Sequence, residues 1–368
     1  MIRRRFLPLC LLTLSAFLPA ETLRIERPIL TFCQTAVDVD VSLVDGMLRP
    51  GGGLFSFYPP DMLPLLAAVA FPQTADRGTV LRVQVLLSED PETLSVELTD
   101  PDGRKACQAR GFRAGDSGGS PLWLVLLPLP SDMKGGDCKL SVNAAVGPRS
   151  MLFRARLPIG SRGFVAETID LTDSLTNLRS APDPKRDEQA VELWNLLQVF
   201  NPGALFETDG FSPPVDGLQR RSAFYGDRRE YRNAGKPAGT TLHGGVDIAV
   251  PEGTTVRSCG KGRVAMSSDR ILTGNTVVVE HLPGLYSLYY HMSKLLVKQG
   301  DLVEKGQPVG LSGMTGLATG PHLHWEVQAQ GVPVDPDFFI GEPLLDKGET
   351  LHGIIDTEPS LKEPLEGR

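Results

Sequence analysis

Concentrated positive charge and aromatic stacking surfaces are both missing from this sequence. Acidic residues outnumber basic ones by 44 to 37, and Lys and Arg form no run outside the extreme N-terminus. Aromatic residues make up only 7% of the chain and show no spacing suited to stacking bases. The glycine-rich segment 310–320 lacks the GxxxxGK[ST] pattern of a phosphate-binding loop. We therefore expect no nucleic-acid partner and no phosphate loop.

Cysteine is also sparse, with five residues and no CxxC spacing, which argues against a cysteine metal site and a thiol catalyst. A protein exported from the cytoplasm can form disulfides. Four of the five cysteines follow residue 20, and the sequence leaves their pairing open. We favour Cys107 with Cys138, because both lie on expected strands of one domain. The four are Cys33, Cys107, Cys138 and Cys259.

Only one apolar run approaches the length of a targeting segment. It covers residues 6–18, follows Arg3, Arg4 and Arg5, and closes on Leu-Pro-Ala at 18–20. It is shorter than the roughly 20 residues that span a bilayer as a helix. We expect a signal peptide at 1–20, cleaved after Ala20, and a periplasmic or otherwise exported protein without stable membrane insertion after cleavage. An uncleaved anchor is the alternative, because Leu18 is less favourable than Ala before the cut.

The length of 368 residues exceeds what one hydrophobic core usually organises, so two domains are expected. Residues 23–172 alternate apolar and polar residues between turns, which predicts an immunoglobulin-like antiparallel β-sandwich. This region contains no histidine, so we interpret it as a spacer or targeting module. Its expected strands are Val80–Leu87, Leu94–Thr99, Leu122–Leu127, Cys138–Ala144, Met151–Leu157 and Phe164–Leu171.

A short helical connector is expected at 173–204. Asp183 is placed to cap a helix that begins at Pro184 and ends near Asn201. Its expected packing face comprises Ala190, Val191, Trp194, Leu197 and Phe200. Residues 205–340 then read as glycine-punctuated strands of a second, mainly antiparallel β domain. Residues 341–368 predict a disordered acidic tail, in which His352 is a bystander.

Histidine is scarce: there are six, and five of them lie between positions 243 and 324, four of which, His243, His291, His322 and His324, belong to the motifs below. His243 and Asp247 are four apart, and His322 and His324 are two apart, so on strands each pair shares one face. Zinc takes imidazole nitrogens and carboxylate oxygens as ligands, so the cluster predicts a metal site. His291 ends an expected strand in which Leu285, Ser287 and Tyr289 share its face. Spacing alone does not decide which histidines bind metal, and His281 is interpreted as structural.

With these motifs in hand, the chain resembles the lysostaphin-like peptidoglycan metalloendopeptidases, whose signature is HxxxD, a lone histidine and then HxH. The resemblance covers roughly residues 215–339 and includes HGGVDIAVPEGTTV, GNTVVVEH, YSLYYHM and GPHLHWEV. The order of signal peptide, all-β domain and short helix is also similar to exported bacterial members with an immunoglobulin-like front domain. Met314 and Leu317 stand where the family more often has polar residues.

The resemblance implies one zinc ion held by His243, Asp247 and His324, with His291 and His322 as catalytic histidines. It implies a zinc endopeptidase that cuts peptide stems or cross-links of peptidoglycan during cell-wall remodelling. The alternative is a silent adaptor of the same fold that activates cell-wall amidases; such relatives lose zinc ligands, which this chain keeps. A carboxypeptidase is a second rival. A longer spacing between the first histidine and the aspartate is expected in such an enzyme, whereas this chain has HxxxD. The sequence identifies no protein regulator.

Overall fold

The computed structural model describes residues 41–44, 47–50, 53–57, 67–117, 119–217 and 220–345. The signal peptide expected at 1–20, Cys33, His352 and most of the expected tail lie outside these residues. Within them, no helix is both long and apolar enough to cross a membrane. The described chain is mainly β with antiparallel sheets, which confirms the predicted fold class.

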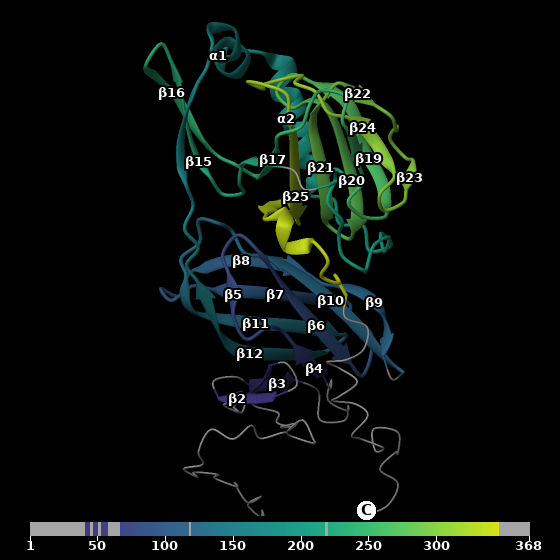
Figure 1. Ribbon diagram of the computed structural model, residues 1–368. Coiled ribbons are helices and arrows are strands. Elements are labelled where there is room, and N and C mark those ends of the chain that lie inside the picture. Colours follow the sequence, from purple (N-terminus) through teal and green to yellow (C-terminus); the bar gives the residue numbers. More distant parts are fainter. Residues whose placement is uncertain are drawn as a thin grey trace, which may run out of the picture.

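The front part of the chain is a sandwich of two mainly antiparallel sheets (Figure 1). One sheet has the order β4 (Ala67–Ala70), β6 (Val80–Leu87), β10 (Ser120–Pro128) and β9 (Phe112–Ser117). The other has the order β3 (Gly53–Phe57), β12 (Arg149–Gly160), β11 (Gly136–Val146), β7 (Thr93–Thr99) and β8 (Lys105–Arg110), with β5 (Ala75–Asp76) beside β12. β1 (Val41–Val44) and β2 (Met47–Pro50) pair separately.

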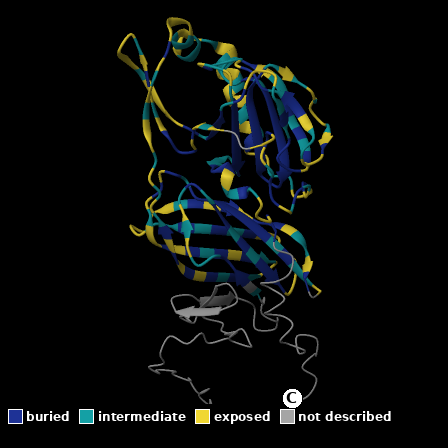
Figure 2. Cartoon of the chain, viewed as in Figure 1, coloured by how far each residue is buried: buried dark blue, intermediate teal, exposed yellow. Residues whose placement is uncertain are grey.

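Strands β6 and β10 are buried on both faces. In β10, Val125 and Leu127 face the core between the two sheets, whereas Leu122, Leu124 and Leu126 belong to a core shared with the second domain. Because side chains alternate along a strand, this one sheet closes two cores at once. The front domain is therefore packed against the second domain. In Figure 2 the sandwich strands alternate between buried and exposed residues, whereas the central strands of the second domain are buried along almost their whole length.

The second domain is built on one large, mainly antiparallel sheet and a small sheet beside it. The large sheet has the order β14 (Arg221–Ala223), β17 (Gly245–Ile248), β25 (Leu323–Ala329), β21 (Leu285–Met292), β20 (Gly274–Leu282), β19 (Gly262–Arg270) and β23 (Leu302–Val303), with β26 (Val332–Val334) beside β25. The small sheet comprises β18 (Thr255–Arg257), β24 (Pro308–Leu311) and β22 (Lys294–Leu295). A 3-10 turn, η1 (Pro336–Phe339), follows.

A three-stranded sheet stands apart from both domains and arches beside the second one (Figure 1). It comprises β13 (Ala166–Asp170), β15 (Arg228–Asn233) and β16 (Lys236–Leu242), with β13 parallel to β15. The strand expected at Phe164–Leu171 was assigned to the sandwich, and that assignment is wrong. Its alternation is real, but its partner is a strand about sixty residues later in sequence, which periodicity cannot identify.

The connector contains two helices, α1 (Asp173–Ser180) and α2 (Pro184–Leu197). Asp183 caps α2 and Pro184 is its first residue, as predicted. The predicted packing face is wrong in part, because Val191 and Trp194 remain 58% and 60% exposed. The face that packs instead carries Leu193, Leu196 and Leu197, which contact a cluster formed by Met266, Val278, Tyr286, Leu288 and Tyr290.

Polar contacts reinforce the joint between the two domains. Gln330 exchanges two hydrogen bonds of 2.9 Å with the backbone of Arg110. The Asp335 backbone N–H donates to the carbonyl of Gly78 at 2.8 Å, and its carboxylate pairs with Arg162. These contacts fix the orientation of the second domain on the sandwich.

The expected disulfide between Cys107 and Cys138 is wrong, since both are free. Cys107 lies on β8 and Cys138 on β11, and β7 runs between these two strands. Strands two places apart are separated by roughly 9.5 Å, beyond the ~7 Å that a disulfide spans between Cα atoms. Both thiols are buried, and burial raises the pKa of Cys107 to about 12.

His281 lies in the interior of the large sheet and is fully buried. Its Nδ1–H donates to the carbonyl of Lys261 at 2.8 Å, and its Nε2 lies 2.7 Å from the hydroxyl of Ser287. Burial lowers the pKa of His281 from 6.5 to about 4. The imidazole is therefore a neutral part of the core.

We expect alkylation of the denatured, unreduced protein to label Cys107, Cys138 and Cys259, since all three are free thiols. In the native protein the same thiols should resist iodoacetamide at pH 8, because burial both shields them and disfavours the thiolate. Peptide mapping by mass spectrometry measures both states. A disulfide-linked peptide that joins Cys107 to Cys138 would contradict the conclusion that β7 keeps these two cysteines too far apart to pair.

We expect the protein to lose stability in mild acid through His281. Its folded pKa lies below its unfolded value, so the unfolded chain binds more protons and stability falls as pH drops from about 6.5 towards 4. The full effect of this one group is roughly 3 kcal/mol. Urea unfolding at pH 7 and pH 4.5 should therefore give a smaller difference for His281→Gln than for the parent. An equal difference in both proteins would exclude His281 as the source.

Candidate functional site

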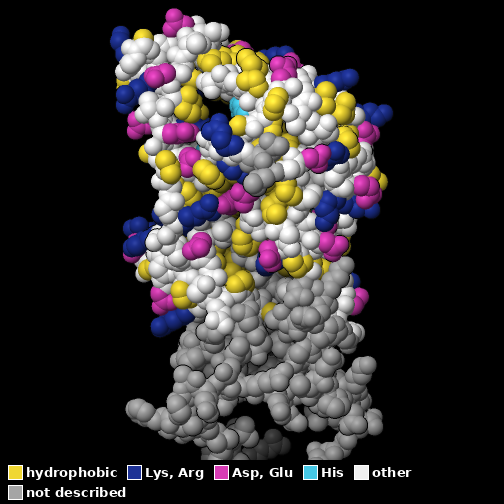
Figure 3. Space-filling model, in the orientation of Figure 1, with side chains coloured by type: hydrophobic (Ala, Val, Ile, Leu, Met, Phe, Trp, Pro, Cys, Tyr) yellow, Lys and Arg dark blue, Asp and Glu magenta, His cyan; other side chains and the backbone are white. Residues whose placement is uncertain are grey.

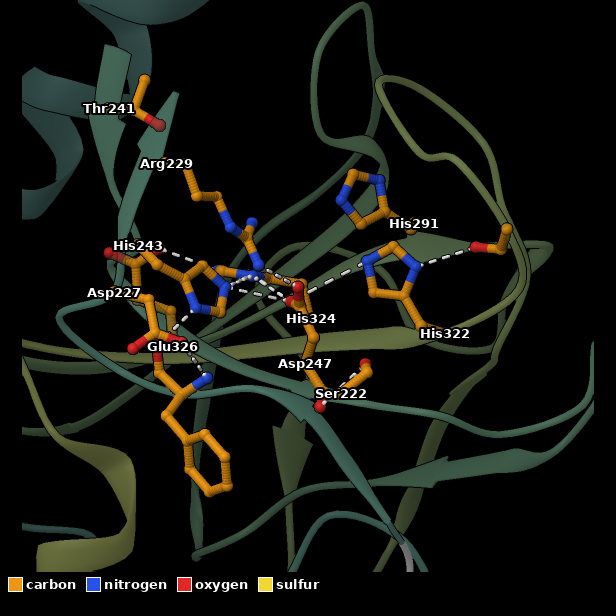
Figure 4. Close-up of polar contacts among 12 residues, drawn as sticks. Ser222, Asp227, Arg229, Thr241, His243, Asp247, His291, His322, His324 and Glu326 are labelled. Atoms are coloured by element: carbon orange, nitrogen blue, oxygen red, sulfur yellow. Dashed lines mark hydrogen bonds and ion pairs between the residues drawn. The ribbon is translucent and has the colours of Figure 1, made fainter. Parts of the chain in front are cut away.

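Three of the residues singled out by spacing meet in one buried cluster. His243 Nε2 lies 3.0 Å from Asp247 Oδ1 and 3.0 Å from His324 Nδ1. His324 Nδ1 in turn lies 2.8 Å from Asp247 Oδ1. These separations approach the ~3.3 Å between ligand atoms that stand 2.0 Å from a tetrahedral centre. Among the described residues, this is the one group with the composition and convergence of a metal site (Figure 4).

Strand pairing produces this convergence. Asp247 on β17 is directly opposite His324 on β25, so both side chains project from the same face of the sheet. His243 lies two residues before β17 begins. Gly245, between them, is required by close packing, since a Cβ there would lie 2.2 Å from the carbonyl oxygen of Trp325. The HxxxD and HxH motifs are therefore brought together by one ladder.

Each candidate ligand is held from behind by a further group. His243 donates its Nδ1–H to the carbonyl of Phe224 at 2.8 Å, which leaves Nε2 unprotonated. His324 Nε2 lies 3.5 Å from Glu326 Oε2. Asp247 Oδ2 accepts a hydrogen bond of 2.5 Å from Arg229 Nη2, so that Oδ1 faces the two imidazoles. Such outer partners fix the orientation of metal ligands.

The cluster is electrostatically coupled. Burial alone raises the pKa of Asp247, yet hydrogen bonds with His243 and His324 hold it well below its usual range. Burial works to lower the pKa of His324, but hydrogen bonds to Asp247 and Glu326 raise it to about 9. Burial lowers the pKa of His243. Two carboxylates, Asp247 and Glu326, and two imidazoles thus share a buried site, whose negative charge suits a bound cation.

The two remaining histidines stand at the edge of this cluster. His322 donates Nδ1–H to the carbonyl of Gly320, and His291 donates Nδ1–H to that of Thr315, each at 2.8 Å. In its neutral form each ring therefore presents Nε2 as its acceptor atom. Nε2 of His322 lies 3.8 Å from Asp247 Oδ1. The ring centroids of His291 and His322 are 4.8 Å apart. Burial lowers the pKa of His291 to about 3, so its imidazole is neutral.

The placement of His291 differs from the strand face predicted for it. Tyr290 is directly opposite His324 and stacks on it with ring centroids 5.0 Å apart. Regular alternation would turn the next residue, His291, into the core with Tyr289. Instead its backbone adopts a positive φ of 62°, which brings the ring to the site face. A strained conformation of this kind costs about 1–3 kcal/mol and is held by the surrounding structure.

The glycine-rich loop carries the backbone groups that orient both histidines. Gly316 has a φ of 76°, and a Cβ there would lie 2.5 Å from the backbone of Leu272 and Gly274. Only glycine fits so close an approach in this conformation. The loop then passes along the site from Leu317 to Pro321. The glycines thus bring backbone close to the site.

A pocket of about 350 Å³ opens over the cluster. One wall is the loop at 317–321; the facing wall comes from β13, α1 and β15. Figure 3 shows a hollow between the wall formed by β13, α1 and β15 and the second domain, with a histidine side chain visible inside it. Sequence reasoning missed Arg229, Glu326 and Tyr290, because each lies outside the histidine motifs or carries no spacing signal of its own.

Comparison with known proteins assigns the region that contains the cluster. The model of Peptidase family M23 matches residues 241–336. Peptidoglycan DD-endopeptidase ShyA of Vibrio cholerae is 43% identical over 122 residues, which cover 33% of this chain and 28% of that protein. The DD-carboxypeptidase/endopeptidase Mpg of Neisseria meningitidis is 41% identical over 95 residues, which cover 26% and 22%.

Among solved structures, the catalytic domain of the antimicrobial peptidase lysostaphin from Staphylococcus simulans is 32% identical, with a TM-score of 0.26; the match covers 30% of this chain and 81% of that domain. The chain thus spans between a fifth and a third of the length of the curated relatives it matches. The matched residues include all five site residues predicted from the sequence. Residues 241–336 are therefore a metallopeptidase domain of peptidase family M23.

Proposed function

We propose that this protein is a zinc-dependent endopeptidase that hydrolyses peptide bonds in the stems or cross-links of peptidoglycan, outside the cytoplasm. The observation that carries the proposal is the convergence of His243 Nε2, Asp247 Oδ1 and His324 Nδ1, which lie 2.8 to 3.0 Å from one another. Names of relatives such as peptidoglycan DD-endopeptidase support the substrate class. The sequence of residues 1–20 supports export.

The donor set fits one zinc ion. Two imidazole nitrogens and one carboxylate oxygen make a three-ligand site with a position left for water, as catalytic zinc requires. A bound zinc lowers the pKa of its water towards about 7 and polarises the scissile carbonyl. The same residues would suit magnesium poorly, because that ion prefers an octahedron of oxygens.

His291 and His322 supply the acid–base groups in this proposal. Their Nδ1–H groups are engaged by backbone carbonyls, so each Nε2 can accept a proton from the attacking water. Once protonated, the same nitrogen donates to the developing oxyanion or to the leaving amine. The low pKa of His291, about 3, favours its neutral form at rest. His322 lies nearer Asp247 and is the better placed to take the proton.

An amidase-activating adaptor of the same fold is the competing function. A purely structural domain has no need for three ligands with anchored outer atoms and two imidazoles in a shared orientation. The complete set therefore favours catalysis. A carboxypeptidase shares zinc and substrate class, and it is separated from an endopeptidase by its products.

We expect the purified full chain to bind one zinc ion and to release uncrosslinked muropeptides from peptidoglycan, and to stop when the metal is chelated. His243→Ala should abolish both zinc binding and hydrolysis. His322→Ala, the matched control, should keep zinc while its kcat falls about a hundredfold or more. Metal analysis and chromatography of muropeptides measure the two effects. Zinc-loaded protein that digests peptidoglycan only beside an amidase would favour the adaptor.

Glu326 is expected to act as a positioning residue for His324. Burial works to raise the pKa of Glu326, yet its contact with His324 keeps that pKa below its usual range. Glu326→Gln removes the charge that orients the imidazole, so zinc affinity should fall about 10–100-fold. Competition with a chromophoric chelator measures this affinity without reference to activity.

The matched control for Glu326→Gln is Glu280→Gln. Glu280 is also buried, but it pairs with Arg263 away from the metal-binding cluster. Its substitution should leave zinc affinity within about twofold of the parent. Equal affinities for both variants and the parent would remove Glu326 from the proposed site.

A further inference from the structure

The pocket wall opposite the glycine-rich loop carries charged groups that the hydrolytic chemistry does not use. Glu167 on β13, Arg229 on β15 and Arg220 before β14 all line the pocket. Each lies outside the residues 241–336 that match the peptidase family. The wall thus lies beyond the part of the chain that matches the family model.

Arg229 is the central group of the wall. Its side chain is only 14% exposed, and it bridges two carboxylates: Nε donates to Glu167 at 2.8 Å and Nη2 to Asp247 at 2.5 Å. Among the described residues Nη1 has no hydrogen-bond partner. In the view of Figure 4, Arg229 reaches Asp247 from the side of β15, whereas His291 and His322 lie beyond Asp247.

The charge balance of the pocket selects the kind of group that it can accept. Within the lining, two carboxylates, Asp247 and Glu167, are matched by two guanidiniums, Arg220 and Arg229. This step rests on the proposed function, because a divalent zinc ion then leaves the pocket with net positive charge. A partly enclosed pocket strengthens the attraction of such a charge for an anion.

We propose that Arg229, with Arg220 at the pocket rim, forms a subsite that binds a carboxylate of the peptide substrate beside the scissile bond. A guanidinium presents donors in a planar fork that matches a carboxylate. Arg229 and the metal-binding cluster contact the same carboxylate, that of Asp247. Its Oδ2 accepts from Arg229, and its Oδ1 faces His243. Successive Cα atoms are about 3.8 Å apart, so a carboxylate on a residue next to the scissile bond is within reach.

The carboxylate has two chemical sources in such a peptide: a main-chain terminus and an acidic side chain. Both offer the same anion to the guanidinium, so the experiment must separate them. Three versions of one synthetic cross-linked peptide do so. The first is the free acid, the second is amidated at its main-chain terminus, and the third is amidated at its side-chain carboxyl.

The test is calorimetric titration of each peptide into zinc-loaded full chain that carries His322→Ala, which slows hydrolysis during the measurement. Arg229→Gln in this background should weaken binding of the free acid about tenfold or more, and Arg220→Gln should weaken it less. The peptide in which the recognised carboxyl is amidated should bind the His322→Ala protein weakly. Adding Arg229→Gln should not weaken its binding further. That peptide identifies the source of the carboxylate.

Arg228→Gln is the matched control, because Arg228 precedes Arg229 on β15 and instead packs over Phe164. It should bind all three peptides within about twofold of the parent. The subsite is overturned if Arg229→Gln weakens all three peptides equally, or if it lowers zinc content alone; Arg229 then only holds Asp247. Hydrolysis is measured separately, on the protein without His322→Ala. If that protein hydrolyses none of the peptides while the His322→Ala protein still prefers the free acid, the proposed function is contradicted and the subsite is not.

Discussion

The direct pairing of Asp247 with His324 across the β17–β25 ladder is the constraint on which the site depends. It places a carboxylate and an imidazole on one face of a sheet, at a separation set by the backbone. His243 joins them because it precedes the same strand. A register slip of one residue would send Asp247 to the opposite face, and the cluster would not form. The sheet therefore specifies the metal centre, and the loops around it specify the histidines at its edge.

Much of this arrangement follows from patterns along the chain. Alternation located five strands of the sandwich, β6, β7, β10, β11 and β12. The connector helix begins at Pro184 with Asp183 as its cap, as predicted, because these signals depend only on neighbouring residues. The HxxxD and HxH spacings likewise brought His243, Asp247 and His324 to one face. The division of the histidines into ligands and helpers came from family resemblance, and it stays a prediction that the geometry accommodates.

What escaped the sequence depends on contacts between distant segments. The positive φ of His291 breaks the alternation of its strand, and it is held by the carbonyl of Thr315 from another loop. Arg229 reaches Asp247 because β13 and β15 pair outside both domains. The absence of a Cys107–Cys138 bond follows from strand order, which no local pattern encodes. Each failure is one of topology, not of local propensity.

The two-sided burial of β10 has a consequence for how this chain can be divided. Leu122, Leu124 and Leu126 are core residues only while the second domain covers them. Cutting the chain between the domains would leave an apolar surface on each fragment, and surfaces of that kind promote aggregation. Each of the two parts thus covers an apolar face of the other. A shortened chain would need polar replacements on the face that it exposes.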